Sequence, residues 1–131
     1  MSETYVHQEL SGKIINAAMY VLGELKPGLD EKIYENALVI ELRRRGHVVE
    51  QQKHHPVYFR EIEVGTLIPD MIVDELVIVD PKVVSAFNEH HLAQMSGYLA
   101  ITRLQLALLL NFKYATIQIK RVVRSASAPS A

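Results

Sequence analysis

Residues 66–82 read Thr-Leu-Ile-Pro-Asp-Met-Ile-Val-Asp-Glu-Leu-Val-Ile-Val-Asp-Pro-Lys. Asp70 and Asp80 each stand inside an apolar run typical of a buried strand, where an ionised carboxylate is costly unless something neutralises it. Two such acids, together with Lys82, favour a shared cation and a phosphate ester. The stretch therefore predicts two buried strands that carry a polar site.

The connection between these strands decides whether the two acids meet. If Asp74-Glu75-Leu76 forms a three-residue loop, Val73 pairs with Val77. Asp70 then lies directly opposite Asp80, with the side chains roughly 4.5–5.5 Å apart, and a divalent metal between them would remove the repulsion. A two-residue loop would place the acids on opposite faces, because a slip of one residue turns every side chain over.

The bulk composition indicates one soluble globular domain. The chain has 131 residues, 49% hydrophobic and 22% charged, which is ordinary for such a domain. A formal charge of −1 argues against a constitutive nucleic-acid coat protein, but not against an enzyme that meets a phosphate backbone locally. The absence of cysteine excludes disulfides and favours a cytoplasmic location. Residues 1–8 do not resemble a secretion signal, and no apolar run is long enough for a bilayer.

Helical periodicity marks three segments. The spacing of apolar residues predicts a first helix from about Glu3 to Leu25. A second is predicted from about Asp30 to Arg45, with Gly46 as its stop, and a third from Asn88, as N-cap, to Thr102. Because the second helix has two apolar sides, we expect it to be covered on both. These sides comprise Leu38 and Leu42 on one, and Ile33, Ala37 and Ile40 on the other.

Alternating and continuous apolar patterns predict the strands. A strand begins at Val48-Val49, and a hairpin follows in which Pro56–Phe59 pairs with Glu63–Val73. Leu76–Val84 comes next. Residues 105–112 are almost continuously apolar, as in a strand buried on both faces, and residues 116–123 alternate. The order is helix, helix, three strands, helix, two strands. This α/β arrangement predicts a single domain over residues 1–124 and a disordered tail at 125–131.

Two helices carry further polar candidates. Glu31 lies at the start of the second helix, where it can reach a cleft or simply complement the helix dipole. His91, Gln94 and Tyr98 share one face of the third helix. Gln94 and Tyr98 could hold a phosphate, a base or an attacking water. Alternatively, Tyr98 is a core residue whose hydroxyl is satisfied by Gln94.

The remaining polar groups have simpler explanations. The pairs His54-His55 and His90-His91 lack a chelating spacing, because adjacent side chains diverge. The basic residues at 43–45, 120–121 and 124 could touch a phosphate backbone, but solvated helix and strand ends explain them equally well.

Four motifs occur in order along the chain. They are GxxExxY at Gly28, Glu31 and Tyr34, Pro-Asp at Pro69 and Asp70, (D/E)xK at Asp80 and Lys82, and QxxxY at Gln94 and Tyr98. With the pattern Leu-Leu-Leu-Asn-Phe at 108–112, the chain from roughly Leu10 to Val123 resembles the GxxExxY proteins of the PD-(D/E)XK nuclease superfamily. The resemblance implies a restriction-endonuclease-like core, a mixed sheet flanked by helices, and Mg²⁺-dependent hydrolysis of DNA by a metal-activated water.

The same resemblance implies a role for each motif residue. Asp70 and Asp80 would ligate Mg²⁺ or Mn²⁺, with Glu31 near or on the metal. Lys82 would orient the attacking water and stabilise the charge that develops on the phosphorane. Gln94 and Tyr98 would lie beside the active site.

One position departs from the pattern. Relatives typically have glutamate and then an apolar residue such as leucine before the lysine, where this chain has Asp80 and Pro81. Proline is disfavoured in central strands, so we expect a bend or bulge between Asp80 and Lys82, although the Pro81 carbonyl could face the metal. The alternative function is a decayed nuclease-fold protein that acts as a structural, self-assembling (homo-oligomeric) or partner-binding module.

Overall fold

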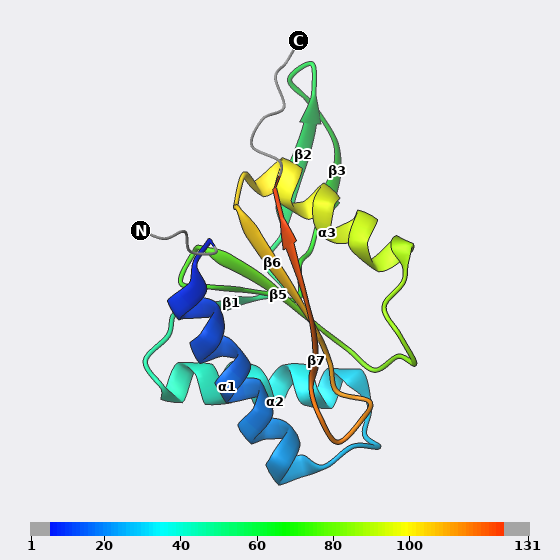
Figure 1. Ribbon diagram of the computed structural model, residues 1–131. Coiled ribbons are helices and arrows are strands. Elements are labelled where there is room, and N and C mark those ends of the chain that lie inside the picture. Colours follow the sequence, from blue (N-terminus) through cyan, green and yellow to red (C-terminus); the bar gives the residue numbers. More distant parts are fainter. Residues whose placement is uncertain (1–5, 125–131) are drawn as a thin grey trace, which may run out of the picture.

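The computed structural model describes residues 6–124, which form three helices, a five-stranded sheet and a two-stranded hairpin (Figure 1). The helices are α1 (Gln8–Leu25), α2 (Glu31–Arg44) and α3 (Glu89–Thr102). The strands are β1 (Val49–Gln51), β2 (His55–Phe59), β3 (Ile62–Leu67), β4 (Met71–Val73), β5 (Val77–Lys82), β6 (Leu106–Asn111) and β7 (Gln118–Val123). The predicted tail and the predicted helix start at Glu3 lie outside the described residues.

The main sheet is mixed, as the resemblance implied. Its strand order is β1-β4-β5-β6-β7. Only the β5–β6 pair in this sheet is parallel, and α3 makes the crossover between these two strands. Five strands, rather than the three predicted, separate α2 from α3. Two of them, β2 and β3, form a second sheet of their own.

The register of β4 and β5 confirms the three-residue connection. Val73 pairs with Val77, and Met71 pairs with Val79. One step further along the same register, Asp70 lies opposite Asp80, just beyond the end of β4. The turn needs left-handed backbone at Asp74 (φ 54°) and Glu75 (φ 60°).

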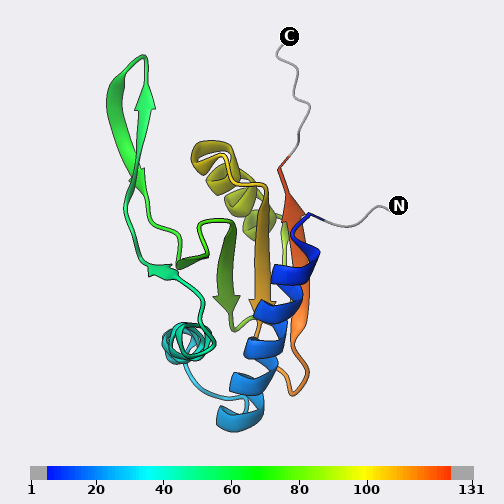
Figure 2. The same cartoon turned by 90° about the vertical axis from the view of Figure 1, so that its left-hand side faces the viewer.

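Helices cover the two faces of the main sheet (Figure 2). Successive side chains of β4 and β5 point alternately to one face and the other. The cluster on the α1 and α2 face includes Met71, Val73, Val77 and Val79. The cluster beneath α3 includes Ile72 and Ile78, with Met95 and Leu99 from the helix. Since side chains alternate along a strand, Asp70, Asp80 and Lys82 share the face covered by α3.

The predicted cover on both sides of α2 is wrong. Leu38 and Leu42 are fully buried, but Ile33 is 44% exposed and Ile40 is 67% exposed. On the second apolar side, Ala37 packs in part against the core, while Ile33 and Ile40 face solvent.

The single strand predicted at Glu63–Val73 is also wrong, since it is divided into β3 and β4. Pro69 lies at the division, where it cannot donate to a ladder and restricts the residue before it to extended backbone. The chain therefore leaves the main sheet after β1 and returns at β4. The hairpin β2–β3 projects beyond the body of the molecule in both views (Figures 1 and 2).

Candidate metal centre

Three carboxylates meet at one end of β4 and β5. Glu31, Asp70 and Asp80 each offer an oxygen atom, and these atoms lie within 4.8 Å of one another. Glu31 comes from the first turn of α2, Asp70 from the link before β4, and Asp80 from β5. Asp80 is 3% exposed, and the other two side chains are half-buried. Hard oxygen ligands in such a group suit Mg²⁺ or Mn²⁺.

The GxxExxY segment positions Glu31. Gly28 has a φ of 113°, which suits glycine. The Tyr34 hydroxyl donates to the Lys26 carbonyl and accepts from the Leu29 N–H at 3.1 Å, so it closes the loop that precedes α2. Glu31 Oε1 accepts from the Val83 N–H at 3.2 Å. Glu31 therefore contacts the residue after β5. A glutamate that only complements the dipole of α2 would not need this contact.

Lys82 lies beside the carboxylates. Its Nζ atom is 3.3 Å from Asp80 Oδ1, and the Lys82 side chain is 16% exposed. Lys82 thus forms an ion pair with Asp80 Oδ1, but this buried oxygen accepts no hydrogen bond from any of residues 6–124. A buried carboxylate oxygen that accepts no hydrogen bond is costly, and a divalent cation bound to it would lower that cost. The residues present thus fit a divalent cation.

Burial and crowding raise the pKa values of both aspartates. Burial, followed by the negative charge of Asp80, raises the pKa of Asp70 to about 7. Burial also raises the pKa of Asp80, against the opposing effects of Asp70 and Lys82. The two neighbouring carboxyl groups therefore resist ionising together. This behaviour is expected of a cation site, because a bound cation would stabilise both negative charges.

A buried glutamate and a glutamine behind Asp70 were missed by the sequence analysis as site residues. The Gln52 amide donates to Asp70 Oδ1 at 3.2 Å and to Glu35 Oε2 at 2.9 Å. Glu35 is 3% exposed and also accepts from Gln51 Nε2 at 2.9 Å and Lys32 Nζ at 3.2 Å. The available signal was that Glu35 interrupts the stripe of α2 that includes Leu38 and Leu42. Gln52 precedes the hairpin and gives no such signal.

Gln94 and Tyr98 are paired on α3. Gln94 Nε2 donates to the Tyr98 hydroxyl at 3.2 Å, and Tyr98 packs in part against the apolar cluster beneath the helix. Burial, with the charges of Asp80 and Asp70, raises the pKa of Tyr98. Because it accepts from Gln94, it keeps its proton to donate.

The bulge predicted between Asp80 and Lys82 is wrong. Asp80, Pro81 and Lys82 pair in unbroken register with Leu109, Leu110 and Asn111. The Lys82 carbonyl accepts from the Phe112 N–H at 2.8 Å, so by alternation the Pro81 peptide group faces the opposite edge. β4 ends opposite Val79, so no strand pairs with β5 on the edge that Pro81 faces. The missing N–H of Pro81 therefore costs the sheet no hydrogen bond.

The other candidate residues have structural partners. His91 Nδ1 accepts from the Asn88 N–H at 3.2 Å, which completes the cap of α3. Arg43 donates to the Val49 carbonyl, and Arg124 donates to the Leu104 carbonyl. Arg43 lies twelve residues along α2 from Glu31, or roughly 18 Å, and does not extend the carboxylate cluster.

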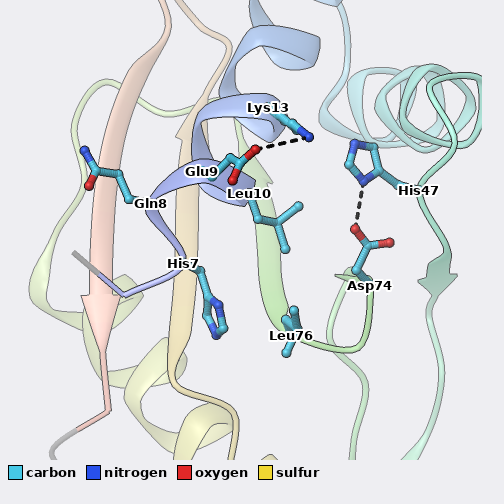
Figure 3. A pocket seen from close by; sticks show the side chains of 8 residues that line it. All are labelled: His7, Gln8, Glu9, Leu10, Lys13, His47, Asp74 and Leu76. Carbon is cyan, nitrogen blue, oxygen red and sulfur yellow. Dashed lines mark hydrogen bonds and ion pairs between the residues drawn. The ribbon is translucent and has the colours of Figure 1, made fainter. Parts of the chain in front are cut away.

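A separate hollow lies away from the carboxylates. It measures about 860 Å³ and lies at the opposite end of β4 and β5 (Figure 3). His47 Nδ1 is 2.8 Å from Asp74 Oδ2, and Asp74 Oδ1 accepts from the Val48 N–H at 2.8 Å. Burial opposes ionisation here, but these hydrogen bonds hold the pKa of Asp74 below its usual value. The His47–Asp74 pair connects the β4–β5 turn to the segment after α2. Lys13, which also lines the hollow, pairs with Glu9.

Comparison with known proteins identifies the superfamily. Residues 8–122 match the family model of the PD-(D/E)XK nuclease superfamily. The chain belongs to this superfamily, and its mixed sheet with flanking helices is consistent with the restriction-endonuclease-like fold. No curated protein and no solved structure matches the chain. Within residues 6–124, no helix is long and apolar enough to cross a membrane.

Proposed function

We propose that this chain is a metal-dependent nuclease of the GxxExxY type that hydrolyses phosphodiester bonds in DNA. The observation that carries the proposal is the convergence of Glu31, Asp70 and Asp80 within 4.8 Å, with Lys82 beside Asp80. Superfamily membership makes a nucleic-acid substrate the natural choice. Glu31, Asp70 and Asp80 would hold Mg²⁺ or Mn²⁺, and the Pro81 carbonyl, on the open edge of β5, is a fourth candidate ligand.

The bound cation would lower the pKa of a water molecule and neutralise phosphate charge. Lys82 supplies a fixed positive charge in the same cleft, where it can donate to the attacking water and stabilise the charge that develops on the phosphate. Tyr98 retains a proton that it can donate to a phosphate oxygen, because Gln94 donates to the tyrosine oxygen. Gln94 and Tyr98 on α3 would position the substrate. Lys82 would stabilise the transition state of the reaction.

The alternative is a decayed nuclease fold that retains only the scaffold. Its support was the change from the usual glutamate and apolar residue to Asp80 and Pro81, and the unbroken register of β5 argues only against the bulge that was expected at Pro81. The enzyme is therefore the preferred hypothesis.

A cleavage assay tests the proposal. The wild-type protein and Lys82→Ala, purified in parallel, are incubated with plasmid and with single-stranded DNA in Mg²⁺, Mn²⁺ or a chelator. We expect metal-dependent cleavage by the wild type that is absent in the variant. Equal cleavage by both proteins would indicate a contaminant, and no cleavage of any DNA by the wild type would favour the decayed scaffold.

A further inference from the structure

Asn111 is a polar residue in the apolar segment 108–112, at the end of β6, and it is fully buried. A buried amide is costly unless its donors and acceptors find partners. Asn111 Oδ1 accepts from the N–H groups of Val84 and Lys113, each at 3.1 Å. Its Nδ2 donates to the Val84 carbonyl at 2.8 Å and to Gln118 Oε1 at 2.9 Å. These bonds use both hydrogens and both lone pairs of the amide, so the side chain is held in one orientation.

This amide holds the chain where β5 ends. Asn111 pairs with Lys82, the last residue of β5, in the parallel register. Val84, two residues further on, binds the Asn111 side chain through both its N–H and its carbonyl. The Val83 N–H lies between these two residues and donates to Glu31 Oε1 at 3.2 Å. The donor that meets Glu31 is therefore fixed on both sides by contacts with the end of β6.

Phe112 connects the same end of β6 to the start of α2. Its N–H donates to the Lys82 carbonyl at 2.8 Å. Its buried ring stacks on Tyr34, with 4.9 Å between the ring centroids. The Tyr34 hydroxyl closes the loop that precedes α2, and Glu31 lies in the first turn of that helix. Asn111 and Phe112, neighbours in the sequence, thus contact the two elements that carry Glu31 and Lys82.

We propose that Asn111 is a positioning residue for the carboxylate centre. Its amide fixes the backbone after β5, so that the Val83 N–H meets Glu31. The same constraint keeps Lys82 beside Asp80. Asn111 spends its hydrogen bonds on protein groups, so it would contact neither the cation nor DNA. The inference rests on the proposed nuclease function and adds the residue that aligns the contributions of α2 and β5.

Asn111→Ala tests this role, with Leu106→Ala as the matched control. Leu106 is fully buried at the other end of β6, so its truncation lowers stability without touching residues 82–84. Calorimetric titration with Mn²⁺ and initial rates on DNA are measured at a temperature where circular dichroism shows both variants to be folded. Asn111→Ala should weaken Mn²⁺ binding by about tenfold or more, as when a residue that orients a metal ligand is lost, and kcat should fall with little change in KM. Leu106→Ala should change Mn²⁺ affinity by less than about twofold, because distant sites act independently.

Asn111→Asp is the conservative variant. Its side chain can still accept from the N–H groups of Val84 and Lys113, so it should bind Mn²⁺ more tightly than Asn111→Ala does. Equal Mn²⁺ affinity of the wild type and Asn111→Ala, or equal losses in Asn111→Ala and Leu106→Ala, would overturn this inference and leave the nuclease proposal standing. A wild type that binds no Mn²⁺ and cleaves no DNA would overturn both.

Amide hydrogen exchange in the wild type tests the contact even if the variants at position 111 fail to fold. The Val84 N–H should exchange as slowly as the amides of β6, although Val84 lies outside the strands, because Asn111 Oδ1 accepts from it. Exchange of the Val84 N–H at the rate of an open loop would overturn the proposed role of Asn111.

Discussion

Lys82 Nζ lies 3.3 Å from Asp80 Oδ1, and both residues project from β5 to the face beneath α3. A lysine two residues after a buried acid is on the same face because strand side chains alternate. The spacing of the (D/E)xK motif thus brings the positive charge and the carboxylate into one cleft.

Lys82→Ala should lower the rate of DNA cleavage by about 10²–10³-fold, the usual loss when a group that stabilises transition-state charge is removed. Cation binding should persist, since the three carboxylates remain. Initial rates on labelled DNA measure the first effect, and calorimetric titration with Mn²⁺ measures the second. Lys13→Ala, which alters a lysine on α1 paired with Glu9, is the control. Loss of cation binding together with cleavage would give Lys82 a structural role instead.

Asp70 should make the cation-free protein less stable as pH rises from 4 to 7. Its pKa is raised from 3.8 to about 7 by burial and by Asp80, so the folded state holds a proton that the unfolded state releases. One such proton changes the free energy of unfolding by at most ~1.4 kcal/mol per pH unit, and by less here because Asp70 is partly exposed.

Urea unfolding in a chelator, from pH 4 to 7.5, checks this effect. Asp70→Asn cannot titrate, so the wild type should lose stability relative to the variant as pH rises. Parallel curves for the two proteins would show that Asp70 is not perturbed.

Gln52→Asn should weaken Mn²⁺ binding by about 10–100-fold, the usual effect of removing a residue that orients a metal ligand. The shorter amide cannot reach both Asp70 and Glu35, while asparagine tolerates the left-handed backbone at this position (φ 57°). Gln51→Asn is the control, because Gln51 donates to Glu35 and Asn36 but not to Asp70. Equal losses in the two variants would show that Gln52 does not act through Asp70.

Pro81→Leu should leave cleavage and stability nearly unchanged, within about threefold in rate and ~1 kcal/mol in the free energy of unfolding. Leucine would restore a backbone N–H at position 81. This N–H would face the unpaired edge of β5, where no strand accepts a hydrogen bond from it. A large gain in cleavage would show instead that proline impairs the wild-type site.

The sequence predicted the local geometry of this site better than its surroundings. The apolar runs on either side of Asp74 fixed the register of β4 and β5, because both strands are buried and a slip would expose them. The pairing of β2 with β3 was predicted, but the separation of this hairpin from the main sheet was missed, because its strand-like residues do not reveal which sheet they join. The exposed side of α2 was misjudged for a related reason, since Ile33 and Ile40 are apolar whether or not anything covers them. Gln52 approaches Asp70 only after the chain has left the sheet and returned, and no local pattern encodes that contact.

The central claim is that Glu31, Asp70 and Asp80 form a divalent-cation site, and anomalous diffraction from crystals soaked in Mn²⁺ tests it most directly. We expect one strong anomalous peak within about 2.3 Å of oxygen atoms of Asp70 and Asp80, and no such peak in Asp80→Asn crystals soaked identically. A wild-type crystal with no peak among these carboxylates, or with its only peak beside His47 and Asp74, would contradict the claim.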